Sequence, residues 1–137
     1  MTSTTPDRER LASCCCGQLS VRTHGEPVRV SMCHCLECQR RTGSTYGAQA
    51  RFLAAQVEVA GESTEYARTG DEGHVARFHF CPGCGSTVWY VLDDVPGAVV
   101  VTLGAFADPG FPAPTFSVYE ERRHAWVSVP DGAERIG

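Results

Sequence analysis

Cysteine spacing constrains this chain more than any other feature. Its eight cysteines lie in three short clusters: Cys14-Cys15-Cys16, Cys33-His34-Cys35-Leu36-Glu37-Cys38 and Cys81-Pro82-Gly83-Cys84. Cysteines this close in sequence seldom meet the Cα separation and direction that a disulfide requires. The spacing therefore indicates metal ligands. Zinc is the metal that such thiolate sets most often hold, and iron in a rubredoxin-like four-cysteine site is the alternative.

The first metal site that the spacing predicts has four cysteines. Proline and glycine between Cys81 and Cys84 form a tight turn that presents two thiolates, which is half of a tetrahedral site. Cys14 and Cys16 are the natural complement, because residues i and i+2 of an extended chain face the same way and Cys15 between them faces the other. We therefore expect Cys14, Cys16, Cys81 and Cys84 to hold a structural zinc ion.

The second predicted site uses the remaining cluster of Cys33, Cys35 and Cys38. Three protein ligands leave the fourth tetrahedral position open, which is typical of a catalytic zinc ion. Alternatively, His34, Cys15 or a distant histidine closes that position and makes the site structural. We expect His34 to point away, because it alternates with its cysteine neighbours. Together the clusters predict two zinc ions per chain.

The rest of the chain is typical of an all-β protein. Short segments rich in β-branched and aromatic residues are separated by glycine, proline and aspartate, which predicts strands at residues 18–23, 28–32, 46–52, 57–60, 65–68, 75–80, 86–92 and 98–103. Only residues 36–42 look helical, and Gly43 is expected to end that helix. We expect one domain at residues 12–137 that follows a flexible polar tail at residues 1–11.

Charge and hydropathy exclude several classes of partner. The net charge of -4 argues against a nucleic-acid partner. No apolar run reaches the ~20 residues of a membrane span, so we expect no membrane partner. No apolar stretch near the start resembles a secretory signal, and eight cysteines suit a reducing compartment, so we expect a cytoplasmic protein.

Two arginines next to the second cluster are candidate substrate-binding residues. Arg40 and Arg41 follow Cys38 and could bind carboxylates of a ligand. We favour Arg41 slightly, because residues three apart lie on the same side of a helical turn. The alternative is that both are solvated surface side chains.

The order of these motifs resembles one known family. Cys-x-Cys-Gly at residues 14–17 and Cys-His-Cys-x-x-Cys at 33–38, then Arg40-Arg41, Gly43-Ser44 and Phe80-Cys81-x-x-Cys84-Gly85-Ser86, are similar to the glutathione-dependent formaldehyde-activating enzyme family. Val101-Thr102-Leu103-Gly104, Asp108-Pro109 and Trp126 extend the resemblance, which covers about residues 12–130.

The resemblance implies a fold and an activity. The fold is a β-tent of folded antiparallel sheets with two zinc sites, also seen in centromere protein V-like proteins. The implied activity is that of a zinc-dependent carbon–sulfur lyase, like S-hydroxymethylglutathione synthase, which handles S-hydroxymethyl adducts of glutathione or another small thiol. It also implies that Cys33, Cys35 and Cys38 hold the catalytic zinc. The alternative function is a non-catalytic, zinc-stabilised β binding module.

Overall fold

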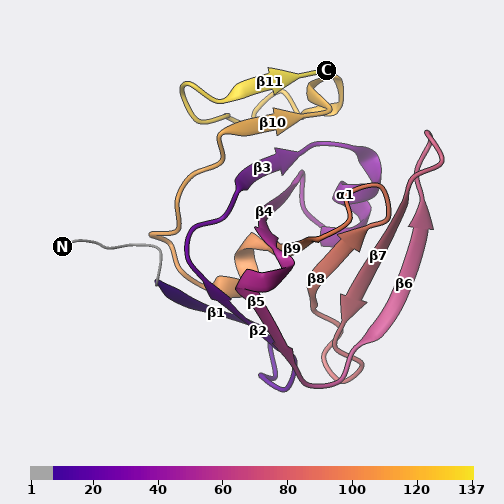
Figure 1. Cartoon of the computed structure of the whole chain (residues 1–137). Coiled ribbons are helices and arrows are strands. Elements are labelled where there is room, and N and C mark those ends of the chain that lie inside the picture. Colours follow the sequence, from indigo (N-terminus) through magenta and orange to yellow (C-terminus); the bar gives the residue numbers. More distant parts are fainter. Residues whose placement is uncertain (1–7) are drawn as a thin grey trace.

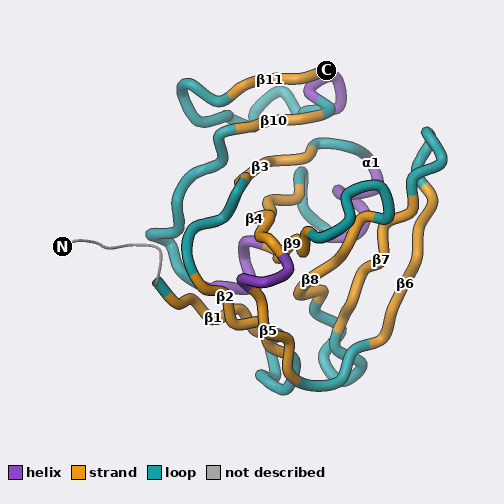
Figure 2. Tube along the Cα trace, in the orientation of Figure 1, coloured by secondary structure: helices purple, strands orange, loops and turns teal. Residues whose placement is uncertain are grey.

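The computed structural model describes residues 8–137, which form eleven strands in two sheets and one short α-helix (Figure 1). Three single turns of 3₁₀ helix, at residues 54–56, 103–106 and 120–122, connect strands. Strand and loop dominate the trace, and helix is confined to these few short segments (Figure 2). The expectation of an all-β fold is confirmed.

The two sheets differ in size and in strand direction. The smaller sheet is antiparallel and has the order β1 (Glu9–Ser13), β2 (Ser20–His24), β5 (Val57–Ala60). The larger sheet of the described chain has the order β11 (Glu134–Ile136), β10 (Phe116–Val118), β3 (Arg29–Cys33), β4 (Gly47–Leu53), β9 (Ala98–Thr102), β8 (Thr87–Leu92), β7 (Val75–Phe80), β6 (Thr64–Thr69). Its strands are antiparallel except β10, which runs parallel to both β3 and β11.

Helix α1 (Leu36–Thr42) has the bounds that the sequence predicts. The Cys35 side chain caps its first turn by accepting a hydrogen bond from the Cys38 backbone N–H. Gly43 ends it in the left-handed conformation, at φ 68°, that a residue without a side chain adopts readily. The helix therefore starts directly after β3 and carries the middle cysteine cluster at its N-terminus.

The first strand corrects the expected tail. β1 begins at Glu9, inside the segment 1–11 that we expect to be flexible, whereas residues 1–7 lie outside the described residues. The alternation of polar and apolar residues that predicts a strand is absent here, because the charged residue Arg10 occupies a buried position. Its guanidinium pairs with Glu26 at 3.2 Å and lies over the ring of Phe111.

The main core lies between the smaller sheet and one face of the larger sheet. Its fully buried members include Ala12, Leu19 and Val21 from the first hairpin and Ala50, Phe52, Val88 and Val101 from the larger sheet. Because side chains alternate along a strand, the other residues of β3 and β4 face away from this core. These residues are Arg29, Ser31, Gln49 and Arg51, and they line a cleft on the opposite face.

A glycine in the turn between β5 and β6 lies against the backbone of the turn that connects β1 and β2. Gly61 has φ +97°, and a Cβ atom there would overlap the Gln18 carbonyl oxygen. Gly73 is a matched control, with φ +85° and no atom within 4 Å of its Cβ position. We expect Gly73→Ala to cost about 1–2 kcal/mol from backbone strain alone, and Gly61→Ala to cost more than about 3 kcal/mol. Denaturant unfolding measures both, and equal losses would contradict the close approach.

Candidate metal centre

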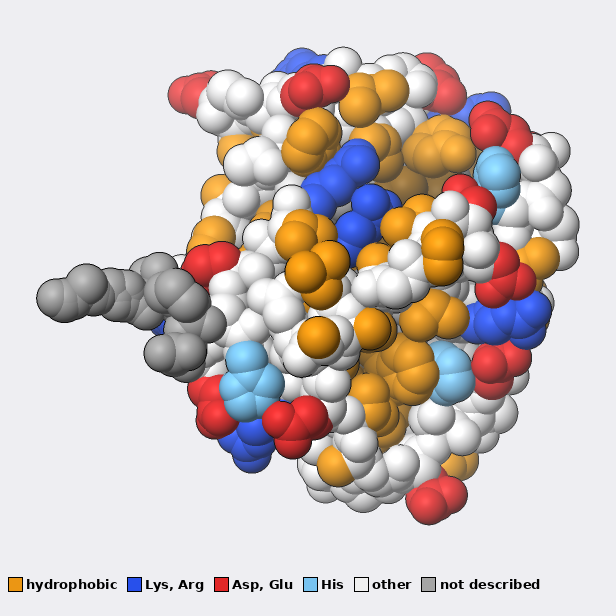
Figure 3. Space-filling view, viewed as in Figure 1, with side chains coloured by type: hydrophobic (Ala, Val, Ile, Leu, Met, Phe, Trp, Pro, Cys, Tyr) orange, Lys and Arg blue, Asp and Glu red, His pale blue; other side chains and the backbone are white. Residues whose placement is uncertain are grey.

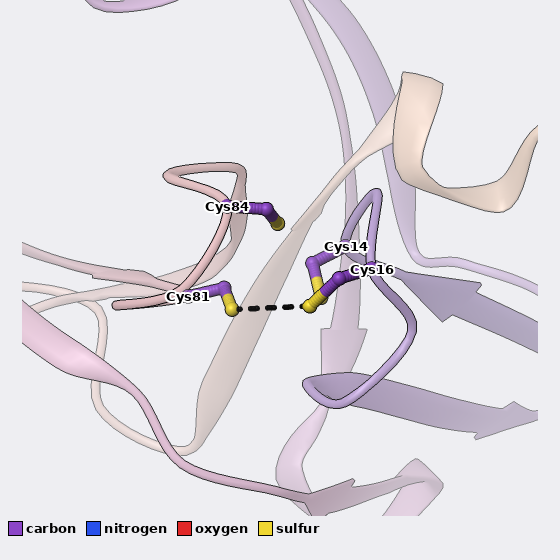
Figure 4. A group of neighbouring side chains, drawn as sticks. All are labelled: Cys14, Cys16, Cys81 and Cys84. Atoms are coloured by element: carbon purple, nitrogen blue, oxygen red, sulfur yellow. Dashed lines mark hydrogen bonds between the residues drawn. The ribbon is translucent and has the colours of Figure 1, made fainter.

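Four cysteines from two distant segments converge between the sheets (Figure 4). Cys14 and Cys16 lie in the turn after β1, and Cys81 and Cys84 lie in the turn after β7. The Cys16 sulfur is 3.6 Å from the sulfurs of both Cys14 and Cys81. The four sulfurs lie within 4.8 Å of one another. The grouping that the spacing predicts is therefore the grouping that the fold brings together.

The arrangement of these sulfurs fits a tetrahedral ion. Zn–S bonds of about 2.3 Å in a tetrahedron place sulfurs about 3.8 Å apart, close to the observed 3.6 Å. N–H groups also donate to the sulfurs, as they do around thiolate ligands: Leu19 N to Cys14, Gly83 N to Cys81, and Gln18 Nε2 to Cys81 at 3.0 Å. The cluster therefore has the geometry and the donors of a closed thiolate site.

Hydrogen bonds to the Cys84 sulfur favour its thiolate form. The Ser86 hydroxyl contributes most, followed by the backbone of Ser86 and of Cys16, and together these bonds lower the pKa of Cys84 to about 5. A metal ligand must be a thiolate, so a lowered pKa favours the form that binds the ion. Sequence reasoning missed Ser86 as part of the cluster, although it lies two residues after the last cysteine.

The sulfurs of Cys14 and Cys16 come together as expected, but the backbone conformation that brings them together is not the expected one. The segment is a turn, not an extended strand, and the Gly17 N–H donates to the Cys14 carbonyl oxygen at 3.1 Å. Cys15 is exposed, and its sulfur joins neither of the two groups of sulfurs that the fold brings together. Its backbone N–H donates to the Ser86 hydroxyl.

Gln18 is a second residue that sequence reasoning missed. Its amide contacts Cys81 and also makes two hydrogen bonds with the backbone of Glu62, one in each direction. Gln18 therefore connects the cysteine cluster to the β5–β6 turn that contains Gly61. No local pattern marks it, because its partners are 44 and 63 residues away.

Cys33, Cys35 and Cys38 form a second cluster at the corner between β3 and α1. Cys33 ends β3, Cys35 caps the helix and Cys38 lies in its first turn. Their sulfurs lie within 4.8 Å of one another, and no fourth His, Cys, Asp or Glu of residues 8–137 joins the group. Hydrogen bonds from Cys33 and Cys38 lower the pKa of Cys35, and the bond with Cys35 raises the pKa of Cys33. Three thiol ligands with one open position fit a metal ion that binds a further ligand.

His34 points away from this cluster, as its alternation with the cysteines predicts. It is fully buried, and its Nε2 is 2.8 Å from the Ser117 hydroxyl. That hydroxyl donates to Glu120, so it accepts from His34. The network holds β10 against the corner where β3 meets α1, and it removes His34 from the set of metal ligands.

The three-cysteine cluster opens into a cleft of about 540 Å³ on the face of the larger sheet opposite the main core. Phe78 and Tyr90 form an apolar wall of this cleft. The space-filling view shows basic side chains side by side in a hollow rimmed by hydrophobic ones (Figure 3). Because the chain contains no lysine, these basic side chains are arginines.

The two candidate arginines lie in different places. Arg40 lines the cleft with the three cysteines and pairs with Glu37 at 2.9 Å. Arg41, which the sequence favours, instead lies over the rings of Phe78 and Tyr90, at 4.9 and 5.5 Å from their centroids. Arg41 therefore supports the aromatic wall. Sequence reasoning missed other arginines of the cleft, among them Arg29 and Arg51.

Among residues 8–137, no helix combines the length and the hydropathy that crossing a bilayer requires. The one α-helix has seven residues.

Comparison with known proteins agrees with the motif order. A crystal structure of a Rhodobacter sphaeroides protein has a similar fold, with a TM-score of 0.56 and 18% identity over 93% of this chain and 99% of that chain. At this identity the likeness concerns the fold alone. The comparison with curated proteins found no match. The family model of the glutathione-dependent formaldehyde-activating enzyme matches residues 9–122, which contain all seven clustered cysteines. The chain belongs to the glutathione-dependent formaldehyde-activating enzyme family.

Proposed function

We propose that the chain is a zinc-dependent carbon–sulfur lyase that forms and cleaves S-hydroxymethyl adducts of glutathione or another small thiol. The observation that carries the proposal is the incomplete ligand set of Cys33, Cys35 and Cys38, which opens into a cleft large enough for a small molecule. A closed set of four ligands would suit a purely structural ion. The family match supports the formaldehyde-activating class in general.

The two clusters would hold zinc ions with different roles. Cys14, Cys16, Cys81 and Cys84 would hold a structural zinc ion, and Cys33, Cys35 and Cys38 would hold a catalytic one. At its open position a zinc ion would lower the pKa of the substrate thiol. In the reaction the thiol sulfur bonds to the carbon of formaldehyde, and the thiol proton ends on the former carbonyl oxygen. The reverse reaction breaks the same carbon–sulfur bond.

The cleft residues of the chain would position the thiol. Phe78 and Tyr90 would exclude water from one side. Arg40, at the mouth of the cleft beside the cysteines, would contact an anionic group of the thiol, and Arg41 would act by holding the aromatic rings in place. A small thiol is the partner that this cleft suits, rather than nucleic acid.

The four-cysteine cluster should determine whether the chain folds. Structural zinc contributes about 10–16 kcal/mol in small sites, which is comparable with a domain's stability of ~5–15 kcal/mol. We expect Cys84→Ser to lose one zinc equivalent and most soluble, folded protein. Cys15→Ser is the matched control and should keep two equivalents. Elemental analysis and circular dichroism measure both. Zinc loss in Cys15→Ser, with zinc kept in Cys14→Ser, would contradict the ligand assignment.

The three-cysteine cluster should be separable from folding. It closes only residues 33–38, whereas the other cluster links residues up to 70 apart, from Cys14 to Cys84, so its loss frees little chain entropy. We expect Cys35→Ser to keep about one zinc equivalent and a native circular dichroism spectrum. A Cys35→Ser protein as poorly folded as Cys84→Ser would show that this site is structural.

Catalysis can be measured against the spontaneous reaction. Carbon-13 exchange spectroscopy follows transfer between labelled formaldehyde and the hydroxymethyl adduct of glutathione. We expect the exchange rate to rise in proportion to wild-type protein and to stay at the spontaneous rate with Cys35→Ser. Wild-type protein that holds two zinc ions, yet accelerates exchange with no thiol tested, would favour the non-catalytic binding module.

A further inference from the structure

Two arginines face each other across neighbouring strands on the wall of the cleft. Arg29 of β3 is directly opposite Arg51 of β4 in the register of the larger sheet. Both side chains are half-buried and line the same cleft as the three cysteines. Like charges directly opposite one another on paired strands destabilise a sheet. The pair is therefore a local cost to stability that an anion placed between the two guanidinium groups would remove.

No carboxylate of the described chain lies within 4.0 Å of either guanidinium group, although the charge of Glu134 acts on Arg29 from farther away. Six arginines of residues 8–137 have ion-pair partners within 4.0 Å, such as Arg10 with Glu26 and Arg77 with Asp93, but neither Arg29 nor Arg51 is among them. Arg29 Nε is also buried without a hydrogen-bond partner.

The Arg29 side chain is held in place. Its guanidinium lies over the Phe116 ring, 4.2 Å from the centroid, which fixes one face of the group. Burial and the charge of Arg51 lower the pKa of Arg29, and the charge of Glu134 offsets only part of this shift. The Arg29 side chain is thus held in place before any ligand binds, which reduces the entropy lost on binding.

The register of β3 and β4 relates this pair to the cysteines. The cross-strand pairs along the wall are Cys33 with Gly47, then Ser31 with Gln49, then Arg29 with Arg51. Four residues of strand separate the Cα atoms of Arg29 and Cys33, about 13 Å at ~3.3 Å per residue. An extended tripeptide spans about 10 Å, and the length of the arginine side chains can cover the remaining distance to the carboxylate.

The middle of the wall offers a hydrogen-bond acceptor. Gln49 donates to the Ser31 hydroxyl at 2.7 Å, and its Oε1 is buried without a partner. A buried acceptor without a partner is costly, so an N–H group of a ligand that lies between the cysteines and the arginines would be favoured. From one end to the other, the wall therefore presents thiols, an acceptor and two cations.

We propose that Arg29 and Arg51 form an anion-binding subsite that holds a carboxylate of a peptide-like thiol, with the thiol group at Cys33, Cys35 and Cys38. This inference rests on the proposed function and specifies its substrate class. The cleft selects thiols that carry a carboxylate several ångströms from sulfur and an N–H group between, over small uncharged thiols. The planar fork of each arginine suits bidentate pairing with a carboxylate.

The test measures binding without turnover. S-methylglutathione carries the carboxylates and amides but no free thiol, so its calorimetric affinity reports the subsite. We expect Arg29→Ala and Arg51→Ala to weaken its binding to the zinc-loaded protein about 10- to 100-fold, as expected for loss of a charge-assisted hydrogen bond. Arg51→Lys should recover only part, because lysine lacks the fork. Arg22→Ala, which removes an exposed arginine paired with Glu9 on the smaller sheet, is the charge-matched control and should bind like wild type.

A stability readout separates a binding role from a packing role. Without ligand, Arg51→Ala should melt at the same or a higher temperature than wild type, because it relieves the repulsion with Arg29. A lower melting temperature together with unchanged affinity would show that Arg51 only packs, and would overturn the subsite. Stronger protection by inorganic phosphate than by S-methylglutathione would overturn the carboxylate assignment.

Two outcomes distinguish this inference from the proposed function. If S-methylglutathione binds in an arginine-dependent way but no thiol is turned over, the subsite stands and the lyase proposal fails. If cysteamine, which has no carboxylate, is turned over as efficiently as glutathione, and both alanine variants bind S-methylglutathione like wild type, the lyase proposal stands and the subsite fails.

Discussion

The placement of the two sheets depends on the four-cysteine cluster. It joins the turn after β1 to the turn after β7, and Gln18 extends the link to the β5–β6 turn. Cys14 and Cys81 are themselves members of the buried core, so the cluster is continuous with the packing between the sheets. A metal ion there would hold both sheets against one shared core, and the opposite face of the larger sheet is then free to form a cleft.

Strands β3 and β4 place side chains on both faces of the larger sheet. Val30, Ala50 and Phe52 pack into the core, while the alternate residues line the cleft. The same alternation that buries the apolar half of each strand therefore aligns Cys33, Ser31 and Arg29 in one row. The cleft wall and the core cannot shift independently, because a one-residue slip would exchange them.

Elements with a local signal could be predicted from the sequence. Helix α1 has the predicted bounds, and β5 and β7 begin and end at the predicted residues. The strands that were missed lack such a signal. β1 carries a buried Arg10, and β10 and β11 have three residues each. A three-residue strand has almost no pattern of its own, and its conformation depends on pairing, here of β10 with β3.

The sequence by itself determined the two cysteine groups, because ligands that share an ion must come in closely spaced sets with turn residues between them. It also determined the family and the all-β class. Only the tertiary structure decided which arginines line the cleft. Arg29 and Arg51 are 22 positions apart, and nothing near either one marks it; they become a pair because the register of β3 and β4 places them opposite each other. Arg41, next to the cysteines in sequence, instead turns onto Phe78 and Tyr90, because the direction of a helical side chain is set by what packs against it.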